Sequence, residues 1–338
     1  MKKIIIAISC CIVLLLLGFC GWRGYQVFKE KRLLSLAKVC AERGDTRTEF
    51  LWLQQVLRVN PRNLEANRRM AMLAQADMSP GAMILRERVV NLVPDSVEDR
   101  LAQAETAMIF KEYTTATNAL AAVSEAGKKT PTYLNLAGVI AAALNQTGTA
   151  EQYFNDAIRL EPDNPVPRLN LSVLRLHGSN SLDLAAARID LERISKTSTN
   201  ASLRVKALRE LVADALRLKD YSNATALAAD LAAQPAAAFE DKLLRLDILR
   251  ENQSAEYGPA LAAYQKDAAT DGTSLSSMTV WLMMRSKPEA ALKWLKSLSA
   301  DTQTNQPGAL LIAECLTMVQ NWAGLQSLVE KQDWNELD

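Results

Sequence analysis

Histidine is nearly absent from this chain, and the motifs that usually carry catalysis are missing with it. His177 is the one histidine among 338 residues, so a Ser-His-Asp or Cys-His device would have a single candidate base. It stands beside Gly178 at a predicted helix end, where a histidine favours a capping role. The sequence contains no His/Cys cluster with zinc spacing, no Gly-x-Gly-x-x-Gly after a strand and no Gly-Lys-Ser/Thr phosphate loop. We therefore expect no catalytic residue, no cofactor and no metal site, and we expect that the protein is not an enzyme.

Strand patterns and a bias of charge are lacking too. No alternating Val/Ile/Thr run stands between Asn-Gly or Asp-Gly turns, and Asp271-Gly272 separates two helical patterns. Lys and Arg total 39 against 38 for Asp and Glu, a net charge of +1, so no broad basic surface points to nucleic acid. Hydrophobic residues make up 49% and charged residues 23%, which is typical of a folded chain. The composition predicts an all-α folded protein that does not bind nucleic acid.

Residues 131–162 contain a helix, a tight turn and a second helix in a recognisable pattern. Small and large apolar residues recur at helical spacing on both halves, and a proline closes the segment: Leu134, Ala137, Gly138 and Ala141, then Ala150, Phe154 and Ala157, then Pro162. Gly148 is predicted to end the turn between the helices. These residues resemble the tetratricopeptide repeat (TPR) family, with Leu134 and Ala141 standing in aromatic positions and Ala137 in a Leu position.

Weaker copies of this pattern recur from about residue 30 to the end. The first copy is imperfect because Glu49 occupies a small-residue position. At about 34 residues per repeat, residues 30–338 accommodate about nine units. The resemblance implies a right-handed TPR-like α-solenoid of about nine helix hairpins, with a possible soft joint at residues 177–200, where loop-type residues gather.

The N-terminus predicts a membrane anchor. After a short basic tail at residues 1–3, residues 4–22 carry no charge over a length of helix that matches the hydrocarbon thickness, and residues 23–29 form a juxtamembrane segment. A cleaved signal peptide is the alternative, but bulky Phe19 replaces the small residues that cleavage needs. Lys2 and Lys3 favour a cytoplasmic N-terminus, while basic residues after the run oppose this. We expect a single-pass protein of a bacterial inner membrane with an extracytoplasmic solenoid.

A recognition surface is the remaining candidate site. In TPR proteins the first helix of each pair lines the concave groove, and the polar residues on or near that face are Arg68, Asn135, Lys206, Arg209, Lys242 and Arg245. Four of them are basic and lie on the first helices of the sixth and seventh repeats: Lys206, Arg209, Lys242 and Arg245. They predict an acidic or carboxylate ligand, with a solvated surface as the alternative. The carboxylate clamp of some TPR domains is not supported, because this chain has Leu34, Lys38, Arg69, Glu98 and Ala102 at the corresponding positions.

Tryptophan is concentrated in the last two repeats. Trp294 matches a large-residue packing position, whereas Trp322 opens the final helix and Trp334 follows it. A solenoid normally ends in a polar cap. Trp322 and Trp334 therefore predict either an exposed apolar end that docks a partner or a chain that continues beyond Asp338.

Two functions remain open at this point. The first is a membrane-tethered TPR scaffold or adaptor that binds protein or peptide ligands in its concave groove, in assembly or secretion at a bacterial cell envelope. The alternative is an accessory subunit, or the N-terminal part of an enzyme whose catalytic domain lies elsewhere.

Overall fold

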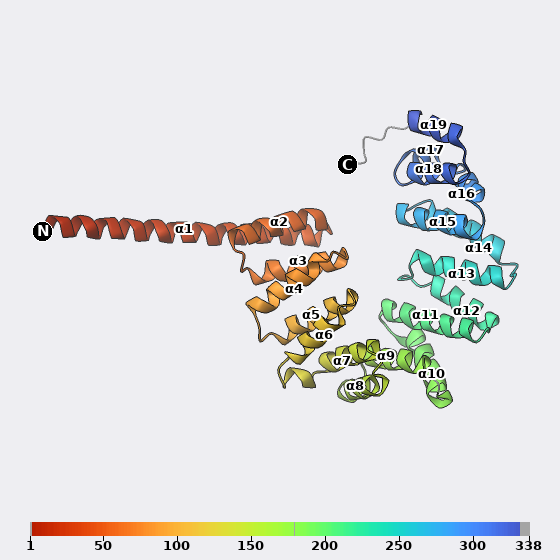
Figure 1. Cartoon of the computed structure of the whole chain (residues 1–338), viewed down its shortest axis with the longest axis horizontal. Helices are drawn as coiled ribbons and strands as arrows, with labels where there is room; N and C mark the ends of the chain where they lie inside the picture. The colour runs from red at the N-terminus through yellow and green to blue at the C-terminus, as the bar shows by residue number, and fades with distance from the viewer. Residues whose placement is uncertain (1, 179, 332–338) are drawn as a thin grey trace. The chain divides into compact units, whose positions relative to one another are not determined.

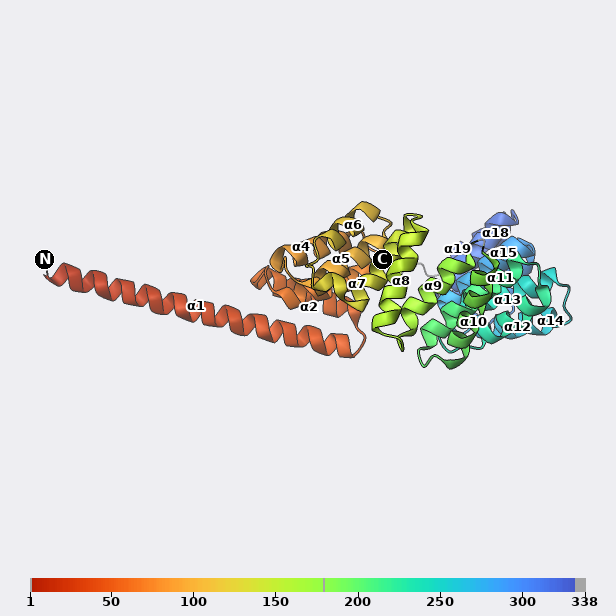
Figure 2. The same cartoon turned by 90° about the horizontal axis from the view of Figure 1, so that it is seen from below.

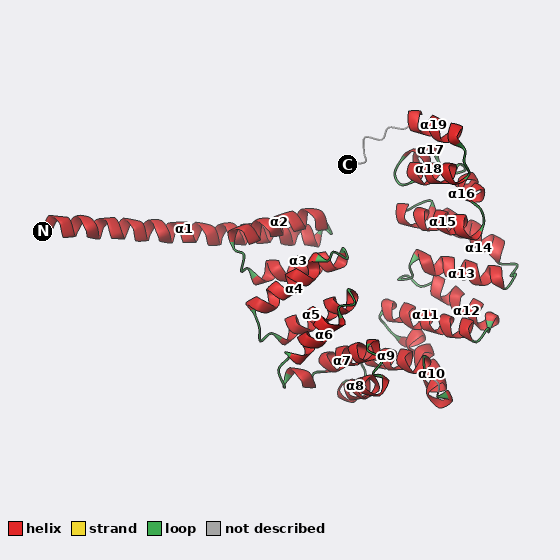
Figure 3. Cartoon of the chain, in the orientation of Figure 1, coloured by secondary structure: helices red, strands yellow, loops and turns green. Residues whose placement is uncertain are grey.

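The computed structural model describes the backbone of residues 2–178 and 180–331, and within those ranges the side chains from Trp22 onward. Every regular element in these ranges is a helix (Figure 3), as the sequence predicts. Contacts divide the chain into two compact units, residues 1–167 and 168–338. The possible joint at residues 177–200 stays a prediction, and a 17-residue helix, Ser181–Thr197, occupies most of that segment.

The first unit contains four helix hairpins, each of a first and a second helix (Figure 1). Its helices are α1 (Lys2–Glu42), α2 (Thr46–Val59), α3 (Leu64–Ala76), α4 (Gly81–Leu92), α5 (Val97–Ile109), α6 (Tyr113–Ala121), the 3-10 turn η1 (Gly127–Lys129), α7 (Pro131–Ala143) and α8 (Thr147–Leu160). The last part of α1 packs along α2, and Figure 2 shows its first part extending beyond α2.

The second unit continues the series of hairpins along the chain. Its helices are α9 (Pro165–Leu176), α10 (Ser181–Thr197), α11 (Ala201–Arg217), α12 (Tyr221–Ala232), α13 (Phe239–Glu251), α14 (Tyr257–Ala268), α15 (Gly272–Arg285), α16 (Pro288–Leu295), α17 (Ala300–Thr304), α18 (Gly308–Met318) and α19 (Trp322–Lys331). The boundary of this unit falls in the first turn of α9. With α17 as an extra turn, the described residues form nine hairpins, so the predicted number of repeats is confirmed. The handedness of the array stays a prediction.

The turns inside the hairpins mark the repeat period in the backbone itself. A residue with positive φ lies between the two helices of seven hairpins: Gly44, Met78, Lys111, Asn145, Lys219, Gln253 and Gln320. Successive members are 33 or 34 residues apart from Gly44 to Asn145, and Lys219 and Gln253 are again 34 apart. The prediction that Gly148 ends the turn between α7 and α8 is wrong. Gly148 is the second residue of α8, and Asn145 adopts the positive-φ turn conformation.

Short polar side chains start most of the helices. Their oxygen atoms accept hydrogen bonds from backbone N–H groups of the first turn, which have no partner inside the helix. Examples are Asp45, Asn63, Ser96, Thr130 and Asp220. The boundaries of the hairpins are therefore fixed locally by the sequence.

The core is a series of small clusters, as expected where each repeat contacts mainly its neighbours. In the pair α7–α8, Phe154 is 1% exposed and its ring lies against the backbone at Gly138, so close that a Cβ built there would be 2.5 Å from the ring. Gly138 is thus the small residue that lets the two helices approach. Near the other end of the chain, Trp281 and Trp294 are buried in one cluster, which confirms that Trp294 is a packing residue.

Candidate functional site

A hollow of about 430 Å³ lies beside the first hairpin and α3, and we call it the N-terminal groove. Its lining combines apolar and charged side chains: Leu34, Ala37, Lys38 and Ala41 of α1, Glu49 and Leu53 of α2, and Glu65, Arg68, Arg69 and Met72 of α3. Ala37 and Leu53 are buried, while Met72 is half exposed. An apolar floor with a few charged groups around it is the usual composition of a ligand-binding hollow.

Charged groups around the groove are joined in pairs. Lys38 Nζ lies 2.8 Å from Glu65 Oε1, and both side chains are more than half exposed. Arg69 donates two hydrogen bonds to Glu49, whose carboxylate is almost fully buried. A guanidinium from the next hairpin therefore compensates the charge of Glu49 and offsets part of the cost of burying a carboxylate in a small-residue position.

Arg68 of α3 also lines the groove, and its guanidinium binds a carboxylate of the following repeat. Its Nε lies 2.8 Å from Oδ1 of Asp99 in the first turn of α5, and its second nitrogen donates to the other oxygen. Burial disfavours the charge of Asp99, but the hydrogen bonds from Arg68 and Ser96 outweigh it and hold the pKa of Asp99 below its usual range. Arg68 thus links two repeats as well as lining the groove.

The basic residues predicted in the sixth and seventh hairpins are also largely paired. Arg209 of α11 donates two hydrogen bonds to Asp241 of α13. Lys242 Nζ lies 2.8 Å from Asp267, and its charge lies above the ring of Tyr264 at 5.6 Å.

Arg245 is paired like Arg209 and Lys242, whereas Lys206 has no ion pair among the described residues. Arg245 donates to Tyr264 Oη at 2.9 Å and to Glu256 Oε2 at 3.0 Å. Lys206 is exposed, and within the described ranges no carboxylate pairs with it. Three of the four predicted cations therefore connect helices, and the acidic-ligand interpretation of this group stays a prediction.

The other predicted contact residues lie apart from the N-terminal groove. Asn135 is partly buried on α7. Trp322 is the first residue of α19 and is 60% exposed, which agrees with an apolar surface at this end of the described chain. Trp334 lies outside the described residues.

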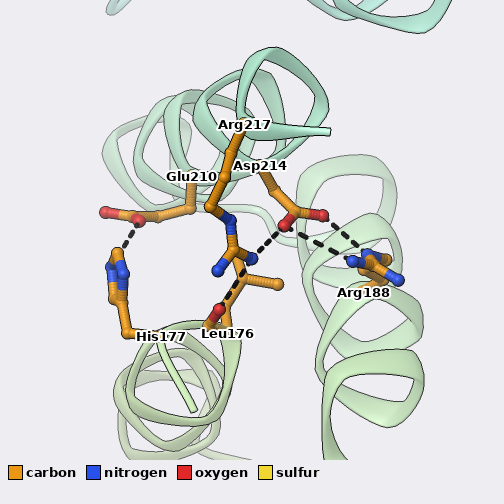
Figure 4. A network of polar contacts seen from close by, with 6 residues as sticks. All are labelled: Leu176, His177, Arg188, Glu210, Asp214 and Arg217. Carbon is orange, nitrogen blue, oxygen red and sulfur yellow. Dashed lines mark hydrogen bonds and ion pairs between the residues drawn. The ribbon is translucent and has the colours of Figure 1, made fainter. Parts of the chain in front are cut away.

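His177 belongs to a polar network that joins α9, α10 and α11 (Figure 4). At its centre Asp214 accepts hydrogen bonds from Arg188 and Arg217, and Arg217 also donates to the carbonyl of Leu176 at the end of α9. Burial opposes the charge of Asp214, yet the two guanidinium groups lower its pKa below the usual range. The network satisfies a helix end and fixes three helices, so its geometry is structural.

His177 itself is exposed at the edge of this network. Its Nε2 lies 3.8 Å from Glu210 Oε2. Across the part of the chain that the structure describes, no three His, Cys, Asp or Glu side chains are grouped to hold a metal ion.

The N-terminal groove was not predicted as a unit from the sequence. Lys38 and Arg69 occupy positions of the TPR carboxylate clamp, but both pair with carboxylates of this chain instead. The signal that could have revealed this was the charge of Glu49 at a position where the family places a small residue.

The predicted anchor at residues 4–22 lies outside the described side chains, except for Trp22. Within the residues whose side chains the structure describes, no helix is long and apolar enough to span a membrane.

No family model and no curated protein matches the chain. Solved structures are similar to it in fold. A tetratricopeptide repeat protein from Parabacteroides merdae has a TM-score of 0.54 at 13% identity, over 87% of this chain and 99% of that one. The human IFIT1 dimer with PPP-AAAA has a TM-score of 0.55 at 13% identity, over 85% of this chain and 67% of that one. PilF from Pseudomonas aeruginosa shares 16% identity over 67% of this chain and 99% of its own, with a TM-score of 0.47.

Two of these structures have TM-scores above 0.5, and at such low identity they show the fold alone. By this likeness the chain has a TPR-like repeat fold, as its resemblance in sequence implies.

Proposed function

We propose that this TPR-like protein is a membrane-tethered scaffold that binds a protein or peptide partner at a bacterial cell envelope, in assembly or secretion. The N-terminal groove carries the proposal. Its floor is apolar, and the charges around it are held in pairs. A peptide could place an apolar side chain on Leu34 and Met72 without leaving a buried charge unpaired.

The pairing also defines the kind of partner. Lys38 and Glu65 are exposed and form a weak surface pair, so each can exchange its partner for a charge of the ligand at little cost. Arg69 and Glu49 are held by two hydrogen bonds and keep the wall rigid. A segment with one large apolar residue flanked by opposite charges fits this surface better than a purely acidic tail.

Photo-cross-linking in cells tests the groove directly. A benzoylphenylalanine at Met72 should yield a discrete cross-linked product, while the same group at Ile84 should not. Both residues are exposed and apolar in the first unit, but Ile84 lies on α4 and does not line the groove. Ala41→Phe, which fills the hollow, should remove the product. Equal labelling from both positions, or a product that survives Ala41→Phe, would exclude the groove.

The tether rests on the sequence of residues 4–22. A reporter enzyme that is active only outside the cytoplasm, fused after Asp338, should be active, and the full chain should remain with the membrane after alkaline carbonate extraction. An inactive but membrane-bound fusion would reverse the proposed orientation. Release by carbonate would exclude the tether and leave the groove proposal standing.

A further inference from the structure

A second hollow, of about 760 Å³, lies where α1 passes the end of α2. We call it the basal hollow. The residues that matter here are Trp22, Arg23, Lys29 and Glu30 of α1, together with Arg58 of α2 and Asn60 at its end. It directly follows the uncharged run of residues 4–22 on the same continuous helix. Any membrane that holds this run therefore places its surface beside the basal hollow.

The charge of the basal hollow is positive. Arg23, Lys29 and Arg58 contribute three cations, against the single carboxylate of Glu30. Oε1 of Glu30 accepts hydrogen bonds from the side-chain amides of Asn60 at 2.9 Å and Asn63 at 2.6 Å, so neutral donors rather than the cations of the hollow hold this oxygen.

Lys29 and Arg58 have no such partner. In the described part of the chain, no carboxylate lies within ion-pair distance of either group. The hollow thus holds one carboxylate against three cations, and two of those cations form no ion pair with it. Such an excess of positive charge suits an anionic ligand, and a phosphate group accepts hydrogen bonds from both lysine and arginine.

The exposed aromatic residues beside the hollow point to a membrane as the source of that anion. Trp22, Tyr25 and Phe28 are 57%, 60% and 64% exposed. They recur every three residues on α1, while Leu33 and Ala37 of the same helix pack into the first core cluster. Aromatic rings of this kind concentrate at the level of lipid headgroups, where an apolar body and a polar edge both find suitable surroundings.

We propose that the basal hollow binds the phosphate of an anionic phospholipid headgroup, with the aromatic residues of α1 in the interfacial layer. This inference rests on the proposed membrane tether. It also accounts for Arg23 and Lys29 after the uncharged run, since a bound headgroup would neutralise them on either side of the membrane.

Lipid binding to the full chain in maltoside micelles, read by native mass spectrometry, tests the inference. Dioleoylphosphatidylglycerol should be retained about tenfold better than dioleoylphosphatidylcholine. The triple variant Arg23→Gln, Lys29→Gln, Arg58→Gln should lose that preference. A matched triple variant, Arg43→Gln, Arg47→Gln, Lys111→Gln, removes the same charge from exposed positions away from the hollow and should keep it.

The outcomes separate the sources of the anion. Equal retention of the two lipids by the wild-type chain, or equal loss in both triple variants, would overturn the inference. Displacement of the lipid by millimolar inorganic phosphate would assign the site to free phosphate instead. The single variant Arg58→Gln serves if the triple variant does not fold, and it should weaken the preference partially.

Carbonate extraction distinguishes this failure from failure of the tether. If the wild-type chain stays in the membrane but shows no lipid preference, only the headgroup site is excluded. If the wild-type chain is extracted, the tether is excluded and the headgroup site is excluded with it.

Discussion

Arg209 Nε lies 2.7 Å from Asp241 Oδ1, and the same guanidinium reaches the second carboxylate oxygen at 2.8 Å. Arg68 and Asp99 repeat this relationship in the first unit. In both cases an arginine on the first helix of one hairpin binds a carboxylate in the first turn of the next first helix. Two of the basic residues that resemble ligand contacts are therefore part of the connection between repeats.

Arg209→Ala should destabilise α11 to α13 by about 1–3 kcal/mol, the range for losing hydrogen bonds to a charged group. Asp241 is 4% exposed, so its carboxylate would be left without its guanidinium partner. Hydrogen exchange of α13 should accelerate in this variant. Lys206→Ala, on the same helix and without an ion pair among the described residues, is the control and should change little. Equal effects of the two substitutions would contradict a structural role for Arg209.

Gly138→Ala should destabilise the α7–α8 hairpin by about 1–3 kcal/mol, because the new methyl group would overlap the ring of Phe154. Gly148→Ala offers the matched control, since nothing lies within 4 Å of a Cβ there and alanine favours a helix. In urea unfolding, the free energy of unfolding of Gly138→Ala should be lower than that of the wild-type protein, and that of Gly148→Ala should be equal or higher. The reverse order would mean that the two helices separate without cost.

Asp214→Asn should remove part of the acid sensitivity of the second unit. The folded state lowers the pKa of Asp214, so this residue stabilises the fold above its unfolded pKa of about 3.9 and the contribution disappears as the pH falls through the lower folded value. The difference in free energy of unfolding between wild type and Asp214→Asn should thus be largest near neutral pH and shrink below about pH 4. A difference that is constant from neutral to acidic pH would show that the charge of Asp214 is not what stabilises the network.

Lys111→Val should destabilise the third hairpin by about 1–2 kcal/mol, whereas Lys111→Gly should be neutral or stabilising. Lys111 has a φ of 60°, a conformation that a β-branched residue disfavours and that glycine adopts readily. Thermal unfolding of the two variants measures the effect. A more stable Lys111→Val would disprove strain at this turn.

The hairpins could be predicted from the sequence because their contacts are local. Small residues such as Gly138, the large Phe154 and the closing Pro162 lie within one repeat, so their spacing is visible along the chain. Helix starts are equally local, since each cap residue and the N–H groups it satisfies are two or three positions apart.

The charged contacts could not be predicted in the same way. Arg68 and Asp99 are 31 residues apart and Arg209 and Asp241 are 32 apart, so composition and helical spacing do not show that they meet. The turn residues were also hidden, because Met78, Lys111 and Gln253 adopt a conformation that sequence patterns associate with glycine or asparagine. The N-terminal groove was hidden for the first of these reasons, since its walls are formed by charged pairs that connect different hairpins.

Because the positive-φ turns recur at a regular interval, whole repeats can be deleted or duplicated between them. Cutting after Lys111 and after Asn145 removes one full period, and the two new ends have the same local backbone geometry. Deleting or duplicating the segment 112–145 should therefore shorten or lengthen the first unit by one repeat while the flanking helices keep their register. Such length variants would turn the number of repeats into an adjustable distance between the two ends of that unit.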